Sequence, residues 1–146
     1  MRPVLLACLT TALAAAAALA ARRTLHVVEV HGESMEPALR SGDRVLVRRL
    51  RPGRRVRRGD VVVITRVGPG EGFTLDGGTN LVIKRAAAVA GDPVSPEFEG
   101  SEEARVPPGR LLVLGDNPSR STDSRQWGLL PESRIAGVVI RRLHTR

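Results

Sequence analysis

The chain has 146 residues, a formal net charge of +8 and one cysteine. This length fits one modest domain with an appendage, and a single cysteine excludes an intrachain disulfide and a multi-cysteine metal site. The basic excess favours a partner with an anionic surface, either phospholipid headgroups or nucleic acid. Aromatic residues make up 2% of the chain and tyrosine is absent, so aliphatic side chains must build the core.

The N-terminal stretch 3–21 carries no charge and is followed by Arg22 and Arg23. An apolar run of about 20 residues is just long enough to span a bilayer as a helix. We therefore expect residues 1–23 to be an N-terminal membrane anchor and residues 24–146 to form a separate folded domain. Two alternatives remain open: Ala18-Leu19-Ala20 is typical of a signal-peptide cleavage site, and the run could be a buried helix of a soluble protein.

The rest of the chain alternates short β-branched runs with turns that contain glycine or proline, which is typical of antiparallel sheets. We expect strands at 24–31, 44–49, 61–65, 81–89, 111–114 and 135–143. We expect loops at 68–78 and 95–109, a polar stretch at 115–128, and a solvated hairpin loop in the arginine-rich segment 48–58. The predicted fold class is mainly β: an antiparallel β-sheet or pseudo-barrel domain with one N-terminal transmembrane helix.

Ser34 stands between Gly32 and Met35, directly after an apolar run, and Pro37 closes a short turn. Glycine permits a sharp bend and close backbone approach, so Ser34 is expected at the end of a strand and not inside it. A serine nucleophile needs an adjacent base. No obvious base lies nearby in the sequence, so it must come from further along the chain.

Of the 23 basic residues, 22 are arginine and the remaining one is Lys84, which ends the apolar run 81–83. Arginine stays protonated in proteins, whereas a buried lysine can lose its proton and act as a base. Ser34 and Lys84 are therefore the candidates for a Ser–Lys dyad. The alternative is that Lys84 is a chance survivor in an arginine-biased composition.

The polar stretch 115–125 reads Gly-Asp-Asn-Pro-Ser-Arg-Ser-Thr-Asp-Ser-Arg. A hydroxyl on such a turn could orient a neutral lysine, and Asp123 and Arg125 could form an ion pair that holds it. The alternative is a turn whose side chains only bond their own backbone.

Four ordered segments, 30–39, 42–47, 83–92 and 115–125, resemble the boxes of type I signal peptidases. The resemblance covers most of residues 27–140. It implies a membrane-bound serine endopeptidase that removes signal peptides from exported preproteins and uses neither a metal nor a cofactor. It also implies a single-pass protein of the cell membrane whose catalytic domain lies on the extracytoplasmic side. The expected partners are preproteins and membrane lipids, and no nucleic acid.

The resemblance also implies roles for individual residues. Ser34 matches the nucleophile, Lys84 the general base and Ser121 the serine that orients the lysine. Asp123 and Arg125 match the structural ion pair. Gly32 and Met35 match positions that place the substrate, and Gly32 resembles the Gram-positive and organellar pattern, in which the backbone N–H of Ser34 would serve the oxyanion.

The chain departs from the family pattern at Pro118, where arginine is usual, and at Ala90, where proline is usual. These changes concern the substrate range more than the mechanism. Alternative interpretations are a specialised maturation protease for one partner protein and a self-cleaving repressor with a Ser–Lys dyad. The latter would need a helical DNA-binding domain. A non-enzymatic basic domain that binds membranes or nucleic acid would leave Lys84 unexplained.

Overall fold

The computed structural model describes residues 24–50, 54–65, 73–75, 79–94 and 105–143, together with positions 13, 15 and 98. The predicted anchor at 1–23 lies outside the described residues except at two positions. Within the described part of the chain, no helix combines the length and the apolar character needed to cross a membrane.

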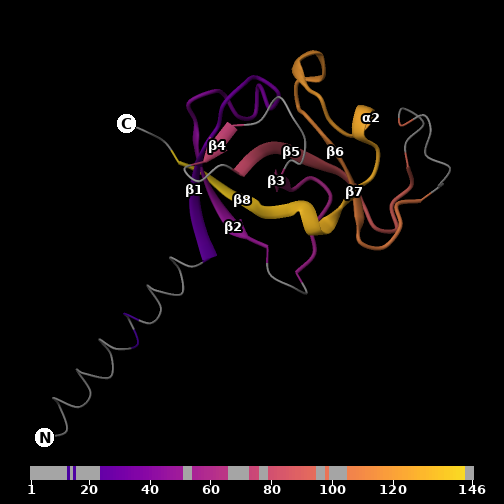
Figure 1. Ribbon diagram of the computed structural model, residues 1–146, viewed down its shortest axis with the longest axis horizontal. Coiled ribbons are helices and arrows are strands. Elements are labelled where there is room, and N and C mark those ends of the chain that lie inside the picture. The colour runs from indigo at the N-terminus through magenta and orange to yellow at the C-terminus, as the bar shows by residue number, and fades with distance from the viewer. Residues whose placement is uncertain are drawn as a thin grey trace, which may run out of the picture.

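Eight strands form one curled antiparallel sheet, which confirms the mainly β prediction (Figure 1). The strands are β1 Leu25–Glu29, β2 Arg44–Arg49, β3 Val61–Thr65, β4 Phe73–Leu75, β5 Thr79–Val89, β6 Arg110–Leu114, β7 Leu130–Pro131 and β8 Ile135–Leu143. Their order across the sheet is β1-β2-β8-β3-β5-β6-β7, and β4 pairs with β5 beside this path. In Figure 1, β1 and β2 lie toward one end of the curl, and β6 and β7 lie toward the other.

The predicted strand boundaries at 44–49, 61–65 and 135–143 agree with β2, β3 and β8. The prediction that segment 48–58 is a hairpin loop was wrong, because the strands on either side of it, β2 and β3, do not pair with each other. Strand β8 lies between them and pairs with both. The loop at 68–78 was wrong in part, because it contains β4, which pairs with the beginning of β5. In both cases the sheet is organised by pairing with strands that come later in the sequence.

The polar stretch 115–128 contains two short helices, η1 Pro118–Arg120 and α2 Ser124–Trp127; a third, η2 Glu132–Arg134, precedes β8. Pro118 stands at the start of η1, where its fixed φ suits the helical conformation. Helix α2 begins with a capping box, in which the Asp123 side chain accepts from the first turn and Gln126 accepts from the Asp123 N–H. The sequence therefore closes this stretch into a rigid turn.

Apolar side chains pack into separate clusters along the sheet. The first contains Val56, Val62, Ile64, Ala86, Leu111, Val113, Leu130, Ile135 and Val138. The second contains Val28, Val30, Met35, Leu39, Val45, Val47 and Val63. Successive residues of one strand, such as Val62 and Val63, belong to different clusters because side chains alternate between the faces of a sheet. Burial on both faces fixes the register of the central strands.

The loop between β1 and β2 is closed at its base and anchored in the core. The Val30 N–H donates to the Asp43 carbonyl at 2.7 Å, and the Gly42 N–H donates to the Val30 carbonyl at 2.8 Å. Met35 and Leu39 are 1% and 6% exposed within the second cluster. The loop that presents Ser34 is therefore held by hydrogen bonds at its base and by two side chains buried in the core.

Candidate active site

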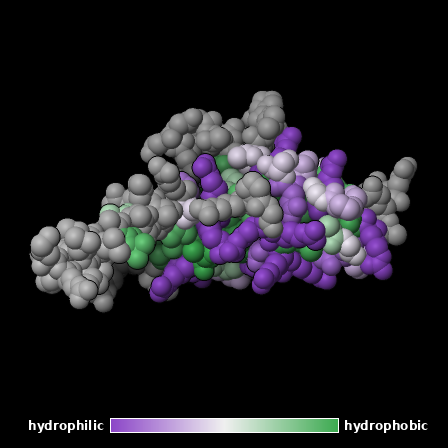
Figure 2. Space-filling view, turned by 90° about the horizontal axis from the view of Figure 1, so that it is seen from below, coloured by the Kyte–Doolittle hydropathy of each residue, from purple (hydrophilic) through white to green (hydrophobic). Residues whose placement is uncertain are grey.

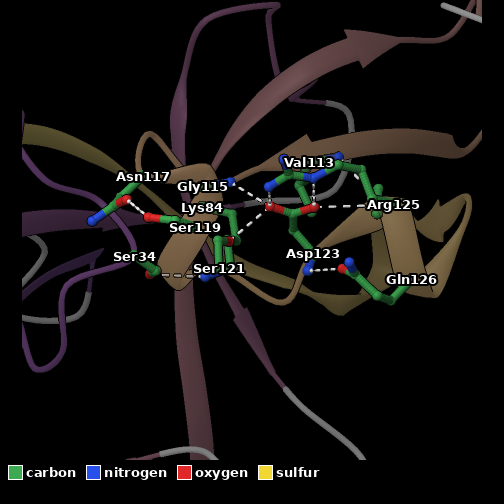
Figure 3. A network of polar contacts seen from close by, with 11 residues as sticks. Ser34, Lys84, Val113, Gly115, Asn117, Ser119, Ser121, Asp123, Arg125 and Gln126 are labelled. Atoms are coloured by element: carbon green, nitrogen blue, oxygen red, sulfur yellow. Dashed lines mark hydrogen bonds and ion pairs between the residues drawn. The ribbon is translucent and has the colours of Figure 1, made fainter. Parts of the chain in front are cut away.

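Ser34 and Lys84 come together although 50 positions separate them in the sequence. The Lys84 Nζ donates a hydrogen bond to the Ser34 Oγ at 2.8 Å (Figure 3). Ser34 lies in the β1–β2 loop and Lys84 in the middle of β5. The contact expected from the sequence is present, whereas the catalytic roles of the two residues stay predictions.

Lys84 lies in an apolar part of the sheet. The residue is 4% exposed, Val62 of β3 stands directly opposite it, and Ala86 follows on the same face of β5. Val62 and Ala86 are 0% and 1% exposed. Removal from water disfavours the ammonium form, and this is the environment in which a lysine can serve as a base.

The two residues that flank Ser34 in the expected site differ in exposure. Gly32 is exposed and has a φ of +83°, a conformation that L side chains rarely adopt, so it supplies the bend before Ser34. Met35 is buried in the second cluster and anchors the loop. That either residue positions a substrate stays a prediction.

Gly115 allows the polar turn to lie against the Ser34 loop. A Cβ at this position would overlap Ser121 and stand 2.6 Å from the carbonyl oxygen of Ser34. Two residues on, the Asn117 N–H donates to that same carbonyl at 3.0 Å. The polar turn thus holds the backbone of Ser34 directly, a contact that sequence reasoning missed.

Ser121 lies between the Ser34 loop and Asp123. Its hydroxyl donates to the Asp123 Oδ2 at 2.7 Å, which leaves the oxygen lone pairs of Ser121 available to accept (Figure 3). The same Oδ2 accepts from the Gly115 N–H at 2.9 Å and from the Arg125 Nη2 at 2.7 Å. Asp123 therefore ties Ser121 and Gly115 to α2.

Asp123 is a fully buried carboxylate, with 0% exposure. Burial alone would raise the pKa of this carboxyl. Hydrogen bonds from the Arg125 side chain, the Gly115 N–H and Ser121 outweigh this effect and lower the pKa from 3.8 to about 2. Asp123 and Arg125 thus form the ion pair that the sequence predicted, with the Arg125 Nε at 2.9 Å from Oδ1.

The lowered pKa of Asp123 predicts acid-sensitive folding. A depressed folded-state pKa contributes stability that is present above pH 3.8 and is lost as the pH falls through about 2. We expect this contribution to be about 2 kcal/mol. Urea unfolding should show Asp123→Asn to be less stable than the parent at pH 6, with the gap shrinking by about that amount at pH 2. A gap that does not change with pH would contradict the assignment.

A second ion pair fastens the polar turn to β5. The Arg85 Nε donates to the Asp116 Oδ1 at 2.8 Å, and the Arg85 Nη2 contacts Oδ2 at 2.5 Å. The Arg85 Nη1 also donates to the Gly59 carbonyl at 2.9 Å. Hydrogen bonding to Asp116 raises the pKa of Arg85. Sequence reasoning gave these residues no role; the only available signal was that each stands beside a predicted site residue or turn.

The arrangement joins a serine hydroxyl, a buried amine and a rigid hydrogen-bonded turn. Within the described ranges, no group of three or more His, Cys, Asp or Glu side chains could hold a metal ion. The chemistry that these groups can perform together is nucleophilic attack by Ser34 with proton transfer to Lys84.

Comparison with known proteins gives consistent relatives. A family model described as "Signal peptidase, peptidase S26" matches residues 2–101 and 95–143. Subunit 1 of the mouse mitochondrial inner membrane protease is 32% identical over 117 residues, covering 77% of this chain and 66% of that protein. Signal peptidase I of Bacillus licheniformis is 31% identical over 132 residues, covering 75% and 71%. A probable signal peptidase I-2 of Synechocystis is 28% identical over 132 residues, covering 74% and 58%.

Proposed function

The chain belongs to the signal peptidase family, peptidase S26, and we propose that it is a membrane-bound serine endopeptidase that removes signal peptides from exported preproteins. In this proposal Ser34 is the nucleophile and Lys84 the general base. The observation that carries it is the 2.8 Å contact between Ser34 and the chain's one lysine, which is 4% exposed.

Acylation follows from this contact. Neutral Lys84 accepts the proton of the Ser34 hydroxyl as the Oγ attacks the scissile carbonyl carbon. The tetrahedral intermediate carries an oxyanion, which the backbone N–H of Ser34 stabilises. Lys84 then returns the proton to the leaving amine as the peptide bond breaks, which leaves the signal peptide as an ester on Ser34.

Deacylation repeats the proton transfers with water. Neutral Lys84 removes a proton from a water molecule, which attacks the ester, and the proton then returns to the Ser34 Oγ. Lys84 must be held in place throughout both steps. We propose that Ser121 does this by accepting a hydrogen bond from Lys84, because its own proton is committed to Asp123 at 2.7 Å.

The proposed setting is the membrane surface. Residues 1–23 are the single-pass anchor and residues 24–146 the catalytic domain, on the extracytoplasmic side. The substrate has small residues such as alanine at the −1 and −3 positions and binds extended beside a strand. Support comes from the names of the relatives, which include a mitochondrial inner membrane protease subunit and signal peptidase I. The match covers 66% of the length of the mouse protease subunit.

A cleavage assay tests this function. The full chain in detergent is incubated with several unrelated preproteins, each with Ala at −3 and −1 or with Leu at both positions. We expect one cut directly after the −1 alanine in each preprotein, and no cut in the Leu versions. Cleavage of one preprotein alone would favour a dedicated maturation protease, and cleavage of none would contradict the proposal.

Ser121→Ala should slow catalysis without abolishing it. The variant loses a group that orients Lys84 but keeps both reacting groups, so we expect kcat to fall about 10- to 10³-fold with little change in KM. Ser121→Thr, which retains the hydroxyl, should recover part of this loss. Steady-state kinetics on one preprotein checks both variants, and wild-type kcat for Ser121→Ala would contradict the orienting role.

A further inference from the structure

The residues directly before Ser34 and Ser121 form an ion pair with each other. Glu33 precedes Ser34, and Arg120 precedes Ser121. The Arg120 Nε lies 3.4 Å from the Glu33 Oε2, and the two side chains are 69% and 55% exposed. The pair therefore joins the Ser34 loop to the polar turn at the surface, one residue away from each hydroxyl of the candidate site.

Backbone hydrogen bonds fix the positions of the two charged residues. The Glu36 N–H donates to the Glu33 carbonyl at 3.1 Å, and the Arg120 N–H donates to the Asn117 carbonyl at 3.2 Å. The Asn117 N–H in turn donates to the Ser34 carbonyl. Glu33 and Arg120 thus belong to two short turns that are tied to each other, which keeps both residues beside Ser34.

Exposure alone does not single out an arginine in this chain. The sequence has 22 arginines, and hydrophilic side chains cover much of the described surface in the view of Figure 2. An exposed ion pair also contributes little to stability, so holding the fold together does not explain this one. What distinguishes Arg120 is its place next to the candidate site and the way in which its guanidinium is engaged.

Arg120 is engaged differently from the two other arginines around the site. Arg85 and Arg125 each bind a carboxylate of the polar turn through both Nε and Nη2. Arg120 contacts Glu33 through Nε, and within the described part of the chain its Nη1 and Nη2 make no hydrogen bond or ion pair. Four N–H donors of an exposed, charged group beside Ser34 are therefore available to a ligand.

We propose that Arg120 determines specificity and favours preproteins in which the first two residues of the mature chain, +1 and +2, are acidic. A carboxylate binds the paired Nη donors of a guanidinium in a bidentate manner. Glu33 lies on the Nε side of the guanidinium and weakens the preference, because its negative charge repels an acidic substrate. This inference rests on the proposed function and names a substrate class for the same site.

The proposed mechanism places the mature end of the substrate near Arg120. Lys84 returns its proton to the leaving amine, which is the nitrogen of residue +1, so residue +1 lies on the Lys84 side of the scissile bond. Ser121 is proposed to contact Lys84, and Arg120 is its neighbour in the chain. An extended substrate advances about 3.3 Å per residue, so residues +1 and +2 both stay close to the scissile bond. The small residues at −1 and −3 offer no charge for an arginine to bind.

A competition assay tests the preference. The full chain in detergent receives an equimolar mixture of two preproteins with Ala at −3 and −1, one with Glu and the other with Gln at both +1 and +2. The ratio of the initial cleavage rates is the ratio of the two kcat/KM values, which a general loss of active protein does not change. We expect the parent to favour the Glu preprotein about fivefold. High salt should bring the ratio toward 1, because it screens exposed charges.

The possible failures of this assay are distinguishable. Equal cleavage of the two preproteins by the parent would overturn the role of Arg120 and leave the protease proposal standing. Cleavage of neither would contradict the protease proposal, and the inference that rests on it would fall with it.

Substitutions of the pair should move the ratio in opposite directions. Arg120→Gln should bring it to about 1, and Arg120→Lys should keep part of the preference, since lysine retains the charge but lacks the paired donors. Glu33→Gln should raise the ratio above the parental value. Glutamine keeps an oxygen that can accept from the Arg120 Nε and removes the competing charge.

Arg105→Gln is the matched control, because it removes the same charge elsewhere on the surface. Arg105 is exposed, and its Nη1 donates to the Gly91 carbonyl at 2.8 Å, beyond the C-terminal end of β5. We expect this variant to keep the parental ratio. A parental ratio in Arg120→Gln, or an equal fall in Arg120→Gln and Arg105→Gln, would overturn the proposal.

Discussion

Ser34→Ala is expected to abolish cleavage of a preprotein while leaving its binding intact. The Ser34 Oγ is the atom that Lys84 contacts at 2.8 Å, and without it no acyl-enzyme can form. By analogy with other serine proteases, kcat/KM should fall on the order of 10⁴- to 10⁶-fold. Single-turnover cleavage measures the loss, and binding of an uncleavable preprotein shows that the site persists.

Ser119→Ala is the matched control for the serine substitution. Ser119 is an exposed serine of the same polar turn, and its hydroxyl donates to the Asn117 Oδ1 at 2.9 Å. It contacts neither Ser34 nor Lys84 among the hydrogen bonds of the described residues. We expect near-parental activity for this variant. Comparable losses in both serine variants would indicate that the turn's structure, and not the Ser34 nucleophile, controls cleavage.

Lys84→Arg and Lys84→Met should be equally inactive, with losses on the order of 10⁴-fold or more. A guanidinium keeps the positive charge but cannot accept a proton, and a thioether has neither property. If Lys84 served only as a cation, the Arg variant would keep much of its activity. Single-turnover rates on one preprotein distinguish the two outcomes.

Stability measurements show whether these lysine variants lose chemistry or folding. Lys84 is 4% exposed, so its replacement by an apolar side chain of similar length removes a buried amine. We expect Lys84→Met to match or exceed the parent in its urea midpoint. If the Met variant were inactive and also strongly destabilised, its loss of activity would be explained by misfolding. That result would count against the dyad.

The sequence was sufficient to pair Ser34 with Lys84. Lys84 is the one lysine among the 23 basic residues, and Gly32 indicates that Ser34 lies in a turn after a strand. Most strands could also be predicted, since β-branched runs bounded by glycine and proline mark their ends. The place of β8 between β2 and β3 could not be predicted, because pairings between residues about 70 to 100 positions apart leave no local signal. Strand β4 was missed because its three residues lie among turn formers.

The contacts that hold the site in place could not be predicted from sequence patterns. Gly115 matters through the space it leaves for Ser121 and for the Ser34 carbonyl, which only the folded chain defines. The Arg85–Asp116 pair joins residues 31 positions apart, and several other arginines were equally plausible partners for Asp116. The anchor predicted at 1–23 lies outside the described residues except at two positions and stays a prediction.

Direct detection of an acyl-enzyme tests the central claim most closely. An ester analogue of a signal peptide acylates faster than it deacylates on a serine protease, so the intermediate accumulates before the steady state. After an acid quench, pepsin digestion and tandem mass spectrometry locate the added mass. The proposed mechanism predicts the signal-peptide acyl group on Ser34 in the parent and no adduct in Lys84→Met. Turnover of the ester with the adduct on another residue, or with full acylation of Ser34 in the Met variant, would contradict it.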